Sequence, residues 1–205
     1  MIPEPAYAAI ILAGGASRRM GAPKALLKWQ GQCFLDRLIE LFAQHCRPVI
    51  VALGHGHERI RAALRRTDQA EFVINPNPER GQLSSLQTAL AAVPPTARGI
   101  LFTPVDYPAF QPETVEALIR TLDASQGGEL LAIPRCEGHR GHPICAARPI
   151  IAELLALPAE TGQAREVIHR HRGRTIYVDV DDPGILQDID EPQHYQALLN
   201  PDSAL

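Results

Sequence analysis

The chain has 205 residues, of which 45% are hydrophobic and 21% are charged, and its formal net charge at pH 7 is −3. These values are typical of a folded globular protein and exclude a disordered or fibrous chain. The negative net charge argues against a protein that coats nucleic acid or an anionic membrane, because neither partner would meet a generally positive surface. Any phosphate must therefore be bound by a local site.

The sequence shows no signal for a membrane or for export. No run approaches the roughly 20 apolar residues of a membrane-spanning helix, and residues 1–7 lack the basic start of a secretion signal. The four cysteines, Cys33, Cys46, Cys136 and Cys145, are widely spaced and form no Cys-x-x-Cys pair. This spacing favours reduced, buried thiols over disulfides or a zinc site. We therefore expect a cytoplasmic protein.

Short runs rich in Ile, Val and Leu alternate along the chain with longer segments of helical periodicity, which is typical of a parallel sheet covered on both faces. The predicted strands are residues 8–13, 49–53, 71–74, 99–103, 130–133, 143–147 and 175–180. The predicted helices are residues 34–45, 59–66, 84–92, 112–124, 149–155, 164–171 and 193–199. No linker or repeat divides the chain, so we expect a single domain over residues 1–205 with three layers, α/β/α. Ligands of such sheets bind beyond the carboxyl ends of the strands.

The loop after the first strand is rich in glycine and arginine. Residues 12–24 read LAGGASRRMGAPK and include Lys24, one of only two lysines in the chain. Glycine lets backbone amides approach an anion, arginine can bind two phosphate oxygens, and lysine supplies a compact charge. The pattern favours a triphosphate-binding loop, although a tight connection with solvated arginines would also explain a bare Gly-Gly turn. It matches neither the dinucleotide fingerprint nor the Walker A loop.

This segment resembles the signature of nucleotidyltransferases, specifically the group that attaches CMP or GMP to molybdopterin, and the resemblance extends from Ala8 to about Tyr195. It implies a Rossmann-like sheet of the nucleotide-diphospho-sugar transferase type and an enzyme that uses Mg²⁺. In this family the residues matching Arg19 and Lys24 balance charge on the triphosphate. The nucleotide-binding positions that the resemblance implies are Leu12, Ala13, Gly14, Gly15, Asn75, Gly81 and Ser85.

The loop after the third predicted strand contains two X-Pro steps, then Gly81 and the pair Ser84-Ser85. We expect one of the serines to begin the next helix, whose free amides could bind an anion or a base edge. A simple N-cap pair would explain the same residues. The segment resembles the N-P…G-x-x-x-S-L motif of the cytidylyltransferase members, in which the matching glycine and second serine help to recognise the nucleotide.

Carboxylates follow two of the later strands. Asp106 comes directly after the fourth predicted strand, and carboxylate oxygen is a ligand that Mg²⁺ prefers. A turn or a helix cap would also explain a lone Asp-x-Pro. The segment resembles the D-x-P motif of the family, whose aspartate binds the metal. Residues 188–192 resemble the family's D-I-D-T-P segment, which assigns Asp190 to the metal side and Asp188 as the second choice. We interpret Asp181 and Asp182 as a solvated acidic turn that caps the last helix.

Residues 137–144 are predicted to join two late strands as a hairpin-like excursion. The sequence of residues 140–143 matches the family's R-G-H-P pattern, whose residues line the place where the acceptor sits. The resemblance therefore implies that Arg140 and His142 lie on the acceptor side. A structural or substrate-contact role for His142 is favoured over acid-base catalysis, because the expected chemistry needs no titrating group there.

The resulting hypothesis is a Mg²⁺-dependent transfer of CMP or GMP to a phosphorylated acceptor, molybdopterin by resemblance, with release of pyrophosphate. Gly14 matches the guanylyl members, whereas Pro23 and residues 81–86, 140–143 and 188–192 look more like the cytidylyl members, so CTP is favoured over GTP. A molybdoenzyme or its chaperone would be a protein partner, with no nucleic acid or membrane involved. Two alternatives stay open: a sugar phosphate or other phosphorylated acceptor, and a non-catalytic nucleotide-binding protein that helps a molybdoenzyme mature.

Overall fold

The computed structural model describes residues 6–200. The expectation drawn from the amino-terminal residues depends partly on residues 1–5, which lie outside the described residues. The central sheet has the strand order β10-β7-β9-β6-β1-β4-β5, and the short β8 pairs with β7. Its strands are β1 (Tyr7–Ala13), β4 (Val49–Leu53), β5 (Glu71–Ile74), β6 (Gly99–Pro104), β7 (Leu131–Cys136), β8 (His139–Arg140), β9 (Ile144–Ala147) and β10 (Thr175–Asp179).

Most neighbouring strands run in parallel. β1 pairs in parallel with both β4 and β6, β4 with β5, and β10 with β7. β9 is antiparallel to both of its neighbours, β6 and β7, and the chain between β7 and β9 makes the predicted hairpin-like excursion. The predicted α/β class with a mostly parallel sheet is confirmed. Because β1, β4, β5 and β6 share one direction, their carboxyl ends meet at the same edge of the sheet.

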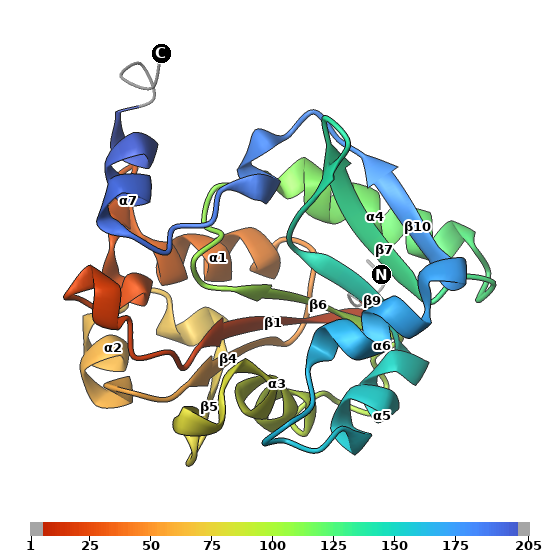
Figure 1. Ribbon diagram of the computed structural model, residues 1–205, viewed down its shortest axis with the longest axis horizontal. Coiled ribbons are helices and arrows are strands. Elements are labelled where there is room, and N and C mark those ends of the chain that lie inside the picture. Colours follow the sequence, from red (N-terminus) through yellow and green to blue (C-terminus); the bar gives the residue numbers. More distant parts are fainter. Residues whose placement is uncertain (1–5, 201–205) are drawn as a thin grey trace.

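Helices cover both faces of this sheet (Figure 1). They are α1 (Phe34–Ala43), α2 (His57–Ala63), α3 (Gln82–Leu90), α4 (Pro112–Ala124), α5 (Arg148–Ala156), α6 (Ala164–Arg170) and α7 (Pro192–Leu199). Odd-numbered residues of β1 pack with α1 and α4, and even-numbered residues pack with α3, α5 and α6. Alternate residues of a strand point to opposite faces, so the fully apolar β1 fills two cores. None of the described helices is long and apolar enough to cross a membrane.

Two features near the site differ from the predicted elements. Lys28–Trp29 (β2) and Gln32–Cys33 (β3) form a small antiparallel hairpin, whose turn residues Gln30 and Gly31 both have positive φ angles.

Helix α3 begins at Gln82, because Gly81 takes a φ of 94° and starts the helix two residues earlier than expected. Ser84 is therefore inside the helix, and its hydroxyl donates to the carbonyl of Gly81 at 2.9 Å. The expected serine N-cap is wrong.

The interpretation of Asp182 as a solvated residue is also wrong. Its carboxylate is buried and accepts hydrogen bonds from the Gln111 amide at 2.8 Å, the Thr114 hydroxyl at 2.6 Å and the Gly184 amide at 3.0 Å. It therefore caps the start of α4, not of the last helix. A short aspartate side chain is well suited to this role, because it satisfies amides that have no partner within the helix.

Replacing Asp182 should reduce the stability of the fold without affecting the site directly. We expect Asp182→Ala to lower the free energy of unfolding by about 2 to 4 kcal/mol, since it removes a cap and leaves buried donors unpaired. Urea unfolding of both proteins measures the difference. The neighbouring exposed Asp181 gives a matched control, and Asp181→Ala should change stability by less than about 0.5 kcal/mol. Equal effects of the two substitutions would contradict the capping role.

Candidate active site

The glycine-rich loop leaves the carboxyl end of β1 and borders a cavity of about 440 Å³. Ser17 has a positive φ of 50°, and its hydroxyl accepts a hydrogen bond from the Lys24 amide at 3.0 Å. This bond closes the loop on itself and returns the chain to the cavity at Lys24. The predicted residues Leu12, Ala13, Gly14, Gly15, Arg19, Lys24, Gly81, Ser85, Asp106 and Asp190 all line this cavity.

Lys24 joins two carboxylates that are far apart in the sequence. Its Nζ lies 2.8 Å from Asp106 Oδ2 and 2.7 Å from Asp190 Oδ1. The guanidinium of Arg19 forms a second ion pair with Asp190. The Lys24 side chain is only 10% exposed, against 21% for Asp106 and 38% for Asp190, so this cluster is partly shielded from water. Ion pairs interact more strongly where water is excluded.

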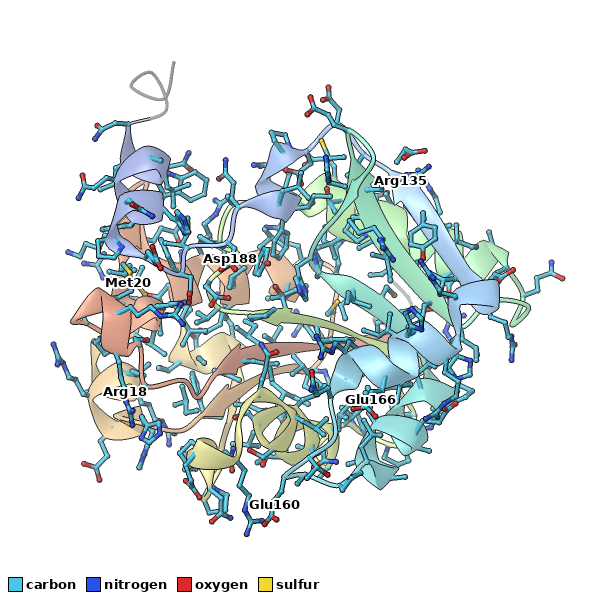
Figure 2. All side chains as sticks on the ribbon, viewed as in Figure 1. Arg18, Met20, Arg135, Glu160, Glu166 and Asp188 are labelled. Atoms are coloured by element: carbon cyan, nitrogen blue, oxygen red, sulfur yellow. The ribbon has the colours of Figure 1, made fainter. Side chains whose placement is uncertain are left out.

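Backbone hydrogen bonds hold the two carboxylates side by side. The Val105 amide donates to the Leu12 carbonyl at 3.0 Å, which fixes the end of β6 against the end of β1. The amide of the buried Ile189 donates to the Asp106 carbonyl at 2.9 Å. The segment before α7 is thereby aligned beside Asp106, and Asp190 turns toward Lys24. Figure 2 labels Met20 on the glycine-rich loop and Asp188 on this carboxy-terminal segment.

The carboxylates fit a divalent cation that also binds phosphate. Asp106 Oδ1 is buried and has no hydrogen-bond partner among residues 6–200, so this carboxylate keeps an oxygen that no protein group satisfies. Residues 6–200 contain no group of three or more His, Cys, Asp or Glu arranged to hold a metal. Mg²⁺ typically takes one or two protein carboxylates and completes its shell with water and substrate phosphates. Asp106 and Asp190 would supply the protein ligands.

Asp188 lies beside this cluster but forms no ion pair with Lys24 or Arg19. Its side chain is exposed and does not line the cavity. Loss of hydration and, second, the nearby charge of Asp106 raise the pKa of the Asp188 carboxyl above its usual value. The structure therefore brings Asp190, and not Asp188, into contact with Lys24.

A second wall of the cavity is formed around α3. The buried Asn75 donates from its Nδ2 to the hydroxyls of Ser84 at 2.8 Å and Ser85 at 3.0 Å. Asn75 itself does not line the cavity and positions Ser85, which does. A Cβ atom at Gly14 would lie 2.7 Å from the Ser85 Oγ, so a larger residue at position 14 would require the Ser85 side chain to move.

Gly54 is a residue that the sequence reasoning missed. It follows β4, and a Cβ atom there would lie 2.7 Å from the Gly14 carbonyl oxygen and 2.8 Å from the Pro78 side chain. It therefore allows three loops to meet at the cavity. The available signal was a glycine placed directly after a buried strand.

The two residues assigned to the acceptor side are separated. His142 borders a second cavity, its ring packs 4.6 Å from that of Tyr107, and its Nδ1 is buried without a partner. Burial lowers the pKa of His142 to about 4, against the opposing effect of Asp106. Arg140 is exposed on β8, lies over the Tyr177 ring, and lines neither cavity. Arg140 lies opposite Arg135 in the pairing of β8 with β7. Figure 2 shows Arg135 far from Met20, which belongs to the glycine-rich loop.

Comparison with known proteins identifies the family. Residues 9–175 match the MobA-like NTP transferase domain. The chain belongs to this family. A molybdenum cofactor cytidylyltransferase of Escherichia coli K12 is 26% identical over 186 residues, which cover 91% of this chain and 92% of the relative. A molybdenum cofactor guanylyltransferase of Sinorhizobium fredii is 34% identical over 175 residues, which cover 80% of this chain and 74% of the relative.

Solved structures share the fold of this MobA-like NTP transferase. The crystal structure of Rv0371c from Mycobacterium tuberculosis H37Rv has a TM-score of 0.79 and 29% identity, covering 97% of this chain and 100% of that chain. A structure described as the complex of that protein with manganese has a TM-score of 0.74 and 26% identity, covering 95% and 98% of the two chains. The family match and the names of the relatives show that the chain is a nucleotidyltransferase, as the motif resemblance predicts.

Proposed function

We propose that this MobA-like NTP transferase transfers CMP from CTP to molybdopterin and releases pyrophosphate, using Mg²⁺. The observation that carries the proposal is the contact of Lys24 with Asp106 and Asp190 at a cavity bordered by the glycine-rich loop. A metal-bound triphosphate needs cations for its phosphate oxygens and carboxylates for its metal, and here both are neighbours. The names of the relatives supply the acceptor.

The chain's own groups act by binding and by charge neutralisation. The Lys24 ammonium has three N–H donors, of which two meet the carboxylates, so one remains for a phosphate oxygen. Arg19 can bind two phosphate oxygens, and the amides of Gly14 and Gly15 can approach closely. When bound, a divalent cation supplies further neutralisation of the triphosphate charge. Preorganised cations of this kind stabilise the charge that develops in the transition state.

The reaction needs no proton transfer by the enzyme. An oxygen of the acceptor phosphate, already ionised at neutral pH, forms the new bond to the α-phosphorus of CTP, while the bond to the pyrophosphate oxygen breaks. No serine or cysteine need be covalently modified. The lowered pKa of His142 keeps its imidazole neutral at neutral pH, which agrees with a contact role and not with acid catalysis.

CTP is preferred to GTP in this proposal on the motif resemblances at residues 81–86, 140–143 and 188–192. The cytidylyltransferase relative aligns with more of the chain, 91% against 80%, whereas the guanylyltransferase relative has the higher identity, 34% against 26%. Gly14 is the sequence feature that favours GTP.

Nucleotide binding tests the first half of the proposal. Thermal unfolding is measured with CTP, GTP, ATP and UTP, each with Mg²⁺. A nucleotide at 100 times its dissociation constant should stabilise the fold by about 2.7 kcal/mol, which raises the melting temperature by about 5 to 10 °C for a chain of this size. We expect the largest shift with CTP. The largest shift with GTP would reassign the base, and no shift with any nucleotide would reject the triphosphate site.

Pyrophosphate release tests the second half. We expect release from CTP only when molybdopterin is added. Release with a sugar phosphate in its place would establish the alternative acceptor class. Nucleotide binding without release from any acceptor would instead favour a non-catalytic protein that assists a molybdoenzyme or its chaperone.

A further inference from the structure

A second cavity of about 400 Å³ adjoins the nucleotide cavity. The two share four wall residues, Leu12, Gly81, Gln82 and Pro104. These lie at the ends of β1 and β6 and at the start of α3, which is also where Lys24 and Asp106 meet. A molecule in the second cavity therefore lies next to a triphosphate bound in the first.

The second cavity has an apolar floor and a positively charged wall. Leu83, Leu86 and Phe102 contribute the floor, and all three are buried. Arg165 is exposed at the wall and has no ion-pair or hydrogen-bond partner among residues 6–200. Arg80 is neutralised by Glu160 at 3.6 Å, so Arg165 supplies the net positive charge of this wall. Such a lining suits a small organic anion.

Glu160 belongs to the loop between α5 and α6, residues 157–163, which forms part of this wall. Figure 2 labels Glu160 on the side of the molecule where α3 lies. This loop is fixed to α3 and is not a loose flap. Gln87 of α3 donates from its Nε2 to the carbonyls of Leu154 at 2.9 Å and Leu157 at 2.8 Å. A Cβ atom at Gly162 would lie 2.8 Å from the Pro158 carbonyl oxygen and 3.2 Å from the Leu83 side chain.

We propose that the α5–α6 loop and Arg165 bind the acceptor and determine which phosphorylated molecule the enzyme accepts. The inference rests on the proposed function. The body of the acceptor lies on the apolar floor beside His142 and Gln82, and Arg165 balances part of its negative charge. An acceptor phosphate that approaches a triphosphate needs such a cation, because like charges repel unless they are neutralised.

Two substitutions test this wall by different physical means. Arg165→Gln removes the charge and keeps a polar side chain, and we expect the KM for molybdopterin to rise about tenfold, while the KM for CTP stays within about twofold. Thr161→Trp places a large ring at the cavity from an exposed loop position, and it should abolish acceptor turnover while the CTP-induced thermal shift remains. Arg172→Gln, an exposed arginine on neither cavity, is the matched control.

The outcomes distinguish a failure of the acceptor-wall assignment from a failure of the proposed transferase function. Unchanged KM values for molybdopterin in both variants would overturn the assignment of the wall, with the transferase function intact. An equal loss of CTP binding and acceptor binding would assign the cavity to the nucleotide and also overturn the inference. If the unsubstituted enzyme releases no pyrophosphate with molybdopterin or with any sugar phosphate, the proposed function fails first and the inference fails with it.

Discussion

Asp106→Asn is expected to reduce turnover about 1000-fold, which corresponds to about 4 kcal/mol of lost transition-state stabilisation. The substitution keeps the size of the side chain and an oxygen that can accept from Lys24, but it removes the negative charge beside the unpaired Oδ1. The backbone bond from Ile189 to the Asp106 carbonyl is unaffected. The melting temperature of the variant should therefore stay close to that of the parent. Steady-state pyrophosphate release with CTP, Mg²⁺ and a verified acceptor measures the effect.

The two later aspartates give the matched comparison. Asp190→Asn should lower turnover strongly, because Asp190 contacts both Lys24 and Arg19, whereas Asp188→Asn should change it by less than about threefold, since Asp188 contacts neither. Wild-type turnover in Asp106→Asn would refute the metal role. A large loss in Asp188→Asn with little loss in Asp190→Asn would move the second carboxylate to Asp188.

Lys24→Met should have opposite effects on nucleotide and on free metal. Without the ammonium, the triphosphate loses a cation in a partly shielded site, and turnover should fall by at least about 100-fold. The carboxylates of Asp106 and Asp190 lose the cation that neutralises them in the free protein. Binding of Mn²⁺ in the absence of nucleotide should therefore become tighter. Titration with Mn²⁺ followed by electron paramagnetic resonance measures this affinity independently of activity.

The chain provides a control for this experiment, because its second lysine is exposed and does not line the cavity. Lys28→Met should leave both Mn²⁺ affinity and turnover unchanged. Weaker binding of Mn²⁺ by Lys24→Met would show that the lysine supports the metal and does not compete with it.

The strands and helices were predictable because the apolar residues that each one buries follow a simple order along the sequence. The buried runs of β1, β4 and β6 are continuous and apolar, and α4 begins with Pro112 at its first position, as the sequence predicts. The β2–β3 hairpin was missed because two-residue strands are too short to show a period. The early start of α3 depends on the positive φ of Gly81, which the sequence pattern does not show. The end of α2 depends on a distant residue, Asp36, which accepts hydrogen bonds from the Arg65 and Arg66 amides.

Which residues belong to the site was more predictable than how those residues are arranged in space. The glycine-rich loop and Asp106 were recognisable because their motifs are local. The meeting of Lys24 with Asp190 joins residues 166 positions apart, and no local pattern reports such a contact. The different surroundings of Arg140 and His142 were not predicted, because β8 ends at Arg140 and the His142 amide instead donates to the carbonyl of Ile185, a residue distant in sequence. The second cavity depends on Gly162 packing against α3, which only the tertiary structure shows.

The bond between the Ile189 amide and the Asp106 carbonyl has a consequence for biosynthesis. During synthesis β1 and β6 are made well before the segment that precedes α7, so a nascent chain holds Lys24 and Asp106 before it holds Asp190. The cluster of Lys24, Asp106 and Asp190 is therefore complete only once that segment has been made. A shortened chain that ends before this segment would keep Lys24 and Asp106 but would lack Asp190.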